Sequence, residues 1–144
     1  MATTFRADVA GGLVTILTAF KTANPTLLGS VHRARPEGYT GDYPIAFVET
    51  RNEAIVHDAQ TRTRLMTPSV AIVGEYRLNA EHMDAFDDLV DALLDHFTTY
   101  PHITPNTVWD RMTVEDYTEE IGDALRPAVR FTFGNVSIQE GRST

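Results

Sequence analysis

Cysteine is absent from this chain of 144 residues, and its absence excludes several classes of function. Without thiols there is no disulfide framework, no thiolate zinc site and no cysteine nucleophile, and we expect folding in a reducing cytoplasm. Lysine is nearly absent too, since Lys21 is the only one among twelve basic residues. The formal net charge is −8. Binding to free nucleic acid is therefore disfavoured, because phosphate contacts need clustered Lys and Arg.

Motifs that carry chemistry are also missing. No apolar run approaches the ~20 residues that a membrane span needs, and residues 1–12 lack the basic start and apolar run of a signal peptide. No HExxH pair, calcium loop, phosphate-binding loop or G-x-S-x-G elbow occurs. We expect Ser30 and the other serines to lie apart from any base. The sequence thus predicts no catalytic residue, no metal site and no cofactor.

Two amphipathic helices are predicted. The first has apolar residues at spacings of three and four and stops near Asn24-Pro25. These residues are Phe5, Val9, Leu13, Ile16 and Phe20. Gly11 and Gly12 interrupt it, and a close contact between this helix and the sheet would explain them. The second helix follows Asn79, a good N-cap, and ends by Tyr100-Pro101. Its apolar stripe is Met83, Phe86, Val90, Leu93 and Phe97.

The remaining segments have the patterns of strands and turns. We predict strands at 30–35, 45–48 and 70–78, with a loop at 36–43. Residues 51–67 are polar and β-tolerant, which predicts an extended hairpin arm in which Ile55 and Val56 pair with Thr63 and Leu65. Two antiparallel strands follow at 109–117 and 127–138, connected by 119–123. The polar residues 139–144 are predicted to form a flexible tail.

Together these elements predict one α+β domain over residues 1–144. Its sheet is mainly antiparallel, both helices pack on one face of the sheet, and a β-hairpin arm protrudes. The repeated strand–helix–strand pattern of a doubly wound parallel sheet is missing. A chain of this length buries roughly 68–70% of its unfolded surface, enough for a real core.

Charge gathers in two places. On the second helix five aspartates lie off the apolar stripe: Asp84, Asp87, Asp88, Asp91 and Asp95. They form a solvated face, a surface that repels or guides a partner, or, least favoured, a metal site. On the arm, Arg51, Arg62 and Arg64 are either solvated or form forked pairs with carboxylates of a neighbouring subunit. An acidic body with a basic arm suits head-to-tail contacts, which close into rings.

Several stretches together carry a family resemblance. In order they are FRADVAGGLVTILTAF, DYPIAFVET, the polar arm, TPSVAIVGEYRL, NAEHMDAFDDLVDALLDHF, and the pair TVWDRMTVEDYTEE and LRPAVRFTFGNVSI. They cover most of the chain. Their layout resembles that of the tail terminator proteins of bacteriophages with long, noncontractile tails.

The resemblance implies a structural role without catalysis or cofactor. Such a protein would form a ring, expected to be a hexamer, on the finished tail tube of the virion, where it stops polymerisation of the tube protein. It would be assembled in the host bacterial cytoplasm and would offer a surface to the neck and head-completion proteins. DNA would pass through the lumen without specific contact, and an acidic lining would prevent sticking. Candidates for that lining are the five aspartates, Glu115, Asp116, Glu119 and Glu120.

Several alternatives stay open, of which a nuclease or other metal enzyme is the least favoured. A related neck or tail-completion protein would share the layout. A non-catalytic ligand-binding α+β module would have a closed apolar pocket between sheet and helices. A small metal-independent enzyme would place His57 or His102 within hydrogen-bond reach of a serine or carboxylate in a cleft.

Overall fold

The computed structural model describes residues 5–37, 39, 41–57, 59–74, 80–104, 107–121 and 124–141. These residues form two helices, α1 (Phe5–Ala23) and α2 (Ala80–Thr99), and eight strands. The strands are β1 (Ser30–His32), β2 (Ile45–His57), β3 (Thr61–Val73), β4 (His102–Thr104), β5 (Thr107–Val108), β6 (Arg111–Ile121), β7 (Ala124–Gly134) and β8 (Val136–Gly141). The predicted α+β class is confirmed.

The main sheet has six strands in the order β1-β2-β3-β7-β6, and β8 joins it beside β3. All its pairings are antiparallel except that of β1 with β2, which is parallel. β3 is the central strand, because it pairs with β2 on one side and with both β7 and β8 on the other. β4 and β5 form a separate small sheet next to α1, which the sequence did not predict.

The partner of β3 changes from β8 to β7 at Pro68. Proline has no backbone N–H to give to a sheet ladder, and here it lies between Met66, opposite β8, and Ser69, opposite β7. On the partner side the break falls at Asn135, whose φ of 57° is in the left-handed region that asparagine tolerates. Pro68 and Asn135 therefore separate the inner half of β3, which pairs with β7, from its outer half, which pairs with β8.

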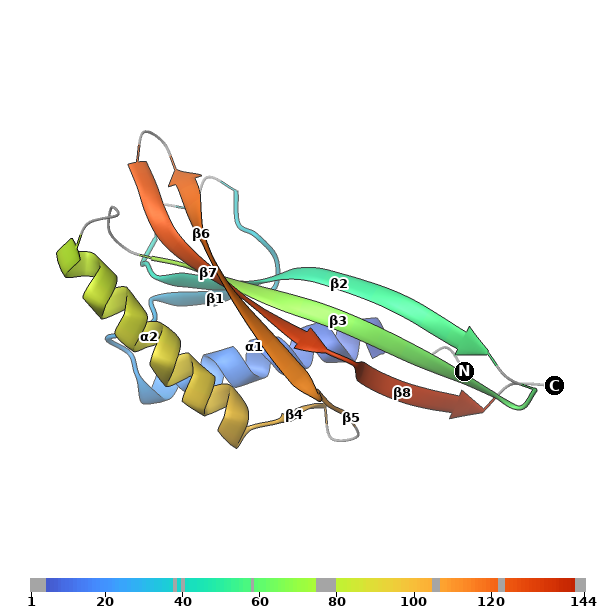
Figure 1. Cartoon of the computed structure of the whole chain (residues 1–144). Helices are drawn as coiled ribbons and strands as arrows, with labels where there is room; N and C mark the ends of the chain where they lie inside the picture. Colours follow the sequence, from blue (N-terminus) through green and yellow to red (C-terminus); the bar gives the residue numbers. More distant parts are fainter. Residues whose placement is uncertain are drawn as a thin grey trace.

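Both helices cover the same face of the sheet, as predicted (Figure 1). All five predicted apolar residues of α1 are buried, and α2 buries Phe86, Leu89, Leu93 and Phe97. Met83 and Val90 are only half-buried. The predicted stripe is therefore correct for three of its residues, and Leu89 belongs to the core in addition. The predicted cap, Asn79, lies outside the described residues.

Of the two adjacent glycines in α1, only Gly12 is required by packing. A Cβ at this position would overlap the carbonyl oxygen of Ile103, so only glycine lets β4 approach the helix so closely. The predicted close contact exists, but its partner is the small sheet and not the main one. A Cβ at Gly11 would meet nothing within 4 Å. Gly11 therefore has no packing role inside the protomer.

The other face of the sheet, here called the helix-free face, has a smaller core of its own. It consists of Ile45, Phe47, Ala71, Val73 and Ala128, with Tyr39, Tyr43 and Tyr117 packed against them. Tyr39 and Tyr43 belong to the segment after β1, which was predicted to be a loop. The body of the sheet is thus covered on both faces.

Several predicted boundaries need correction. β1 ends at His32, short of the predicted residue 35. Glu119 and Glu120, predicted to lie in a connection, belong to β6, because the ladder with β7 continues up to Ile121. Residues 139–141, predicted to begin a flexible tail, pair with β3 as the end of β8. The predicted strand 70–78 is confirmed up to Val73, and residues 75–79 lie outside the described part.

The arm consists of the outer half of β2 (50–57), the outer half of β3 (61–67) and β8. It projects beyond the helices, and its three strands lie side by side (Figure 1). A two-stranded hairpin was predicted, so the third strand is new. Val56 lies opposite Thr63 as predicted, whereas Leu65 lies opposite Ala54 and not Ile55.

Candidate assembly surfaces

The two faces of the arm differ in charge. Residues directly opposite each other on paired strands share a face, and successive residues alternate between faces. The helix-side face contains Met66 and Val136 of the main core. It also carries Arg51, Glu53, His57, Arg62 and Arg64, and Glu140 of β8 lies opposite Arg62. The opposite face, here called the open face, has no ionisable residue among those described: Thr50, Asn52, Ala54, Val56, Thr61, Thr63, Leu65, Thr67, Ser137, Gln139 and Gly141.

Near its tip the arm exposes apolar side chains on both faces. Ile55 is 52% exposed on the helix-side face, and its neighbour Val56 is 55% exposed on the open face. A single exposed apolar residue is common on any protein surface. Two adjacent ones at the end of a projection indicate that neither face of the tip is covered within the protomer.

An ion-pair cluster fixes the middle of the arm to α1. Arg64 of β3 donates from Nε and Nη2 to the carboxylate of Glu53 on β2, with an Nη2 to Oε1 distance of 3.1 Å. Arg6 of α1 reaches the same carboxylate at 3.0 Å. The Arg64 guanidinium also lies 5.2 Å from the centre of the Phe5 ring. The hydrogen bond from Arg64 lowers the pKa of Glu53, although burial acts in the opposite direction.

This cluster bears on the predicted interface arginines. The side chain of Arg64 is only 12% exposed, and both sides of its fork are used inside the protomer. Arg51 and Arg62 are half-buried at the two ends of the helix-side face, opposite Pro68 and His57. Arg64 therefore stabilises the arm within its own protomer.

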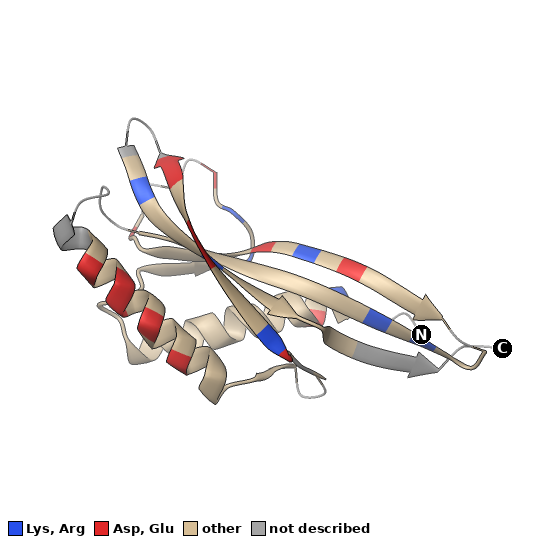
Figure 2. Ribbon diagram, in the orientation of Figure 1, with Lys and Arg blue, Asp and Glu red and all other residues tan. Residues whose placement is uncertain are grey.

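The five predicted aspartates do lie together on the outside of α2 (Figure 2). All are exposed, and within the described part of the chain none forms an ion pair. Glu119, in contrast, lies on the helix-free face, where it pairs with Arg35 and is 12% exposed. Glu120 is its exposed neighbour at the end of β6. The candidate acidic lining is thus divided between two separate regions.

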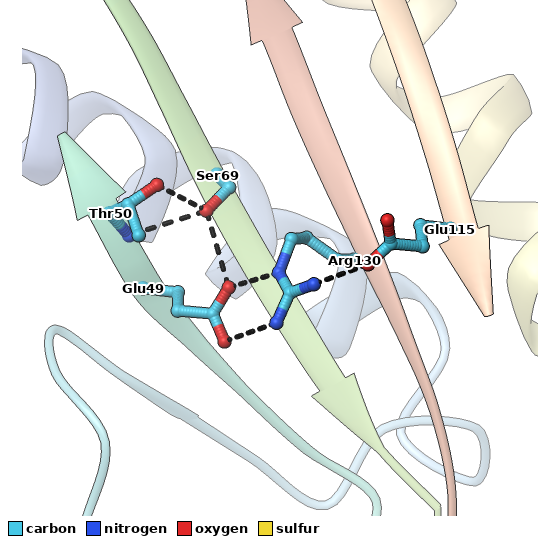
Figure 3. A network of polar contacts seen from close by, with 5 residues as sticks. All are labelled: Glu49, Thr50, Ser69, Glu115 and Arg130. Carbon is cyan, nitrogen blue, oxygen red and sulfur yellow. Dashed lines mark hydrogen bonds and ion pairs between the residues drawn. The ribbon is translucent and has the colours of Figure 1, made fainter. Parts of the chain in front are cut away.

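A second ion-pair network crosses the helix-free face of the body (Figure 3). Arg130 of β7 makes a forked contact with Glu49 of β2, with Nη2 and Oε2 3.0 Å apart, and pairs with Glu115 of β6 at 2.5 Å. Glu49 also accepts a hydrogen bond at 3.4 Å from Ser69, whose hydroxyl lies 2.7 Å from that of Thr50. The hydrogen bond with Glu49 raises the pKa of Arg130, which therefore stays charged. The network joins four strands, and no local sequence signal could have shown it.

One serine does lie beside a base, contrary to our expectation. Ser30 Oγ is 2.9 Å from Nε2 of His32, and Tyr39 donates its hydroxyl to Ser30 Oγ at 2.9 Å. Ser30 also donates to the carbonyl oxygen of Asp42 at 3.2 Å. Among the described residues no carboxylate orients His32, which an activated nucleophile of this type requires. We interpret the group as a tie between β1 and the segment that follows it.

Other chemical candidates stay apart. His57 lies at the arm tip and His102 on β4; both are exposed, and in the described part of the chain neither hydrogen-bonds a serine or carboxylate. Among the described residues no three His, Asp or Glu side chains lie close enough together to hold a metal ion.

Two hollows have contrasting linings. An open groove of about 630 Å³ runs between α1 and β4, and of its lining residues only Asp8 and His102 are ionisable. Ala7, Gly11 and Thr15 form its α1 side at intervals of four residues. A cleft of about 340 Å³ on the helix-free face is lined by three aromatic rings and by Glu37, Glu119 and Glu120. Arg35 lies 5.8 Å from the centre of the Phe47 ring in that cleft.

Comparisons with known proteins leave the family open. None of the described helices is long and apolar enough to cross a membrane. No protein-family model matches the chain. No curated protein matches it either.

Proposed function

We propose that the protein is a structural subunit that assembles with copies of itself into a ring capping the tail tube of a noncontractile bacteriophage tail. In this role it ends polymerisation of the tube protein and presents a surface to the neck and head-completion proteins at the tail–neck junction. The number of copies is proposed to be six. The resemblance of the sequence to tail terminator proteins suggests the role, and two features of the structure support it.

The arm is the observation that carries the proposal. It extends the sheet beyond the helices, which leaves Ile55 and Val56 about half exposed at its tip. Exposed apolar side chains on a projecting element are typical of a surface that a partner covers. The arm is also held in one orientation by the contacts of Glu53 with Arg64 and Arg6. A preformed projection loses little conformational freedom on binding, which favours its use in assembly.

The second feature is the carboxylate row on α2. These aspartates are exposed and have no ion-pair partner among the described residues, so their negative potential is not neutralised locally. Glu119 and Glu115 are instead paired with Arg35 and Arg130. We therefore propose that α2, and not β6, lines the passage for DNA, where like charge prevents sticking.

The space between sheet and helices favours assembly over ligand binding. A binding module would need a pocket there, but the buried rings of Phe97, Phe131 and Phe133 meet in this space, with centroids 5.2 and 5.0 Å from Phe97. The cleft on the helix-free face is another candidate for a ligand. Its own Arg35 already lies over Phe47 and pairs with Glu119.

The proposal is tested by measuring native mass with light scattering and imaging the same sample by negative-stain microscopy. We expect closed rings with a central hole, either alone or after the protein is mixed with purified tail tubes. Added to growing tubes, the protein should sit at one end and stop elongation, while tube protein alone continues to grow. A monomer that neither binds tubes nor changes their length would overturn the proposal.

A further inference from the structure

The open face of the arm is a flat surface without charge. It is three strands wide and seven residues long on β3, or about 14 Å by 23 Å at ordinary strand spacings. The described residues on it are all uncharged, although the chain as a whole has a net charge of −8. Val56 stands on it with 55% of its surface exposed. A partner that covers this face should therefore have few charges, because a buried charge would find no counter-ion there.

The groove between α1 and β4 is lined mostly by uncharged residues. Its α1 side includes Ala7, Gly11 and Thr15, its other side includes Ile103 and Thr104, and its described ionisable residues are Asp8 and His102. Gly11 is in the middle of a helix, where glycine is among the weakest helix formers. No internal contact requires it, since an added Cβ would meet nothing within 4 Å. The absent side chain keeps the groove open, and this favours close approach by another chain.

A molecule cannot place its own arm in its own groove. α1 packs on the helix side of the sheet, whereas the side chains of the open face, such as Val56, point to the opposite side. The acidic outer side of α2 is a poor alternative receptor. Covering α2 with the open face would remove water from a row of carboxylates, Asp87 and Asp91 among them, without supplying a cation, whereas the groove, among its described lining residues, contains only the carboxylate of Asp8. A second copy, offering its groove, is the occupant that fits.

We propose that the open face of the arm of one copy docks in the groove between α1 and β4 of the next copy. The inference rests on the proposed function and deepens it, because it names the two surfaces that join subunits in the ring. The contact is head-to-tail, since two different patches meet, and repeated contacts of this kind close into a ring.

Area sets the strength of this contact. The open face offers roughly 330 Å² from its dimensions, less than half of the ~800 Å² per partner in a standard stable interface. A single arm–groove pair is therefore weak. In a closed ring every copy gives one arm and receives one, so the contacts support one another, and assembly should rise steeply with concentration or on a tube end.

The absence of cysteine makes a direct test simple. Val56→Cys places a thiol on the open face, and Thr15→Cys places one on the exposed side of α1 in the groove. A chain with both changes is treated with a short bismaleimide at high concentration and on tail tubes, and the products are separated in denaturant. We expect a ladder of dimer, trimer and higher species that ends at the ring size.

The matched control is the double variant Ile55→Cys with Thr15→Cys. Ile55 is as exposed as Val56 and one residue away, but on the other face of the arm. It should give no ladder. Equal ladders from both pairs, no cross-link at all, or dimers from Val56→Cys alone, which would mean arm on arm, would each overturn the proposed contact.

The experiments distinguish failure of the arm–groove contact from failure of the proposed ring function. Rings seen by microscopy without a Val56–Thr15 ladder overturn the arm–groove contact and leave the ring. A ladder without an upper end keeps the contact and overturns closure of the ring. As a second measurement, Gly11→Leu should fill the groove and abolish the ladder while the monomer keeps its far-UV circular dichroism. A full ladder from that variant would also contradict the contact.

Discussion

The same two strands are buried in the body and exposed in the arm, and the comparison shows that neighbours, not the strands themselves, decide burial. At its start β2 buries four residues in a row, Ile45 to Val48, because helices lie on one side and the segment with Tyr39 and Tyr43 on the other. From Thr50 outward the described residues form no second layer over the open face. Charge in the arm is also uneven, because the helix-side face carries ionisable residues and the described part of the open face does not.

Irregularities in the backbone mark the border between the two regions. β2 has a bulge between Val48 and Thr50, β3 has Pro68, and the break between β7 and β8 is at Asn135. Each interrupts a regular ladder, and bulges of this kind bend and twist a strand. We interpret the border as the place where the sheet leaves its covering layers and becomes the arm.

The largest expected effect on stability comes from a truncation in the core of the body, compared with a truncation in the arm. Phe97→Ala removes a ring that is 1% exposed and packs against Phe131 and Phe133, so we expect a loss of about 3–5 kcal/mol in the free energy of unfolding. The measurement is urea or thermal unfolding followed by circular dichroism. Val56→Ala is the matched truncation in the arm and should change stability by about 0.5 kcal/mol or less. Equal losses from the two would mean that the arm is part of the core.

A smaller loss is expected when the arm is detached from α1. Glu53→Gln leaves Arg64 and Arg6 without their carboxylate, and hydrogen bonds to charged groups of this type contribute about 1.5–3 kcal/mol. Glu49→Gln on the body is the control, because it removes the partner of Arg130 and leaves the contacts of Glu53 with Arg64 and Arg6 intact. Amide exchange in residues 61–66 should increase for Glu53→Gln and stay unchanged for Glu49→Gln. Unchanged exchange in both would show that the cluster does not hold the arm.

The same carboxylate gives a pH dependence. The pKa of Glu53 is lower in the folded protein than its ordinary value of 4.5, so its contribution to stability is complete above that value and is lost as pH falls through the folded pKa. Thermal midpoints of the wild type should therefore drop more steeply than those of Glu53→Gln as the pH falls below 4.5. Parallel curves for the two proteins would contradict the assignment.

The contrast between local and long-range signals explains how much the sequence could predict. Both helices, the sheet class and the arm were readable, because helical spacing and alternation are local patterns. Leu89 was not predicted to be in the core. The predicted stripe runs from Phe86 to Leu93 through Val90, and a path through Leu89 has the same spacings of three and four. The β8 strand and the Glu49–Arg130 network depend on partners far apart in the chain. Polar residues such as Gln139 pair with β3 although nothing in their own composition indicates a strand.

The two glycines of α1 test different contacts, Gly12 one within the protomer and Gly11 the proposed one between copies. Gly12→Ala would force β4 away, because its Cβ would overlap the Ile103 carbonyl oxygen, and overpacking of this kind costs about 1–3 kcal/mol. The expected result is a lower thermal midpoint. A midpoint equal to that of the wild type would mean that β4 is not held against the helix as described.

The last effect on stability has the opposite sign. Gly11→Ala adds a Cβ that meets nothing within 4 Å, and alanine favours a helix by about 0.8–1.0 kcal/mol over glycine, so the monomer should become more stable. If the groove beside Gly11 receives the arm of another copy, the added methyl group reduces the depth available to Val56, and ring formation should require a higher concentration. Thermal unfolding and light scattering on the same samples measure both quantities. A variant that is more stable and assembles as well as the wild type would show that Gly11 is not kept for the contact between copies, whereas a gain in stability together with weaker assembly ties this glycine to the ring.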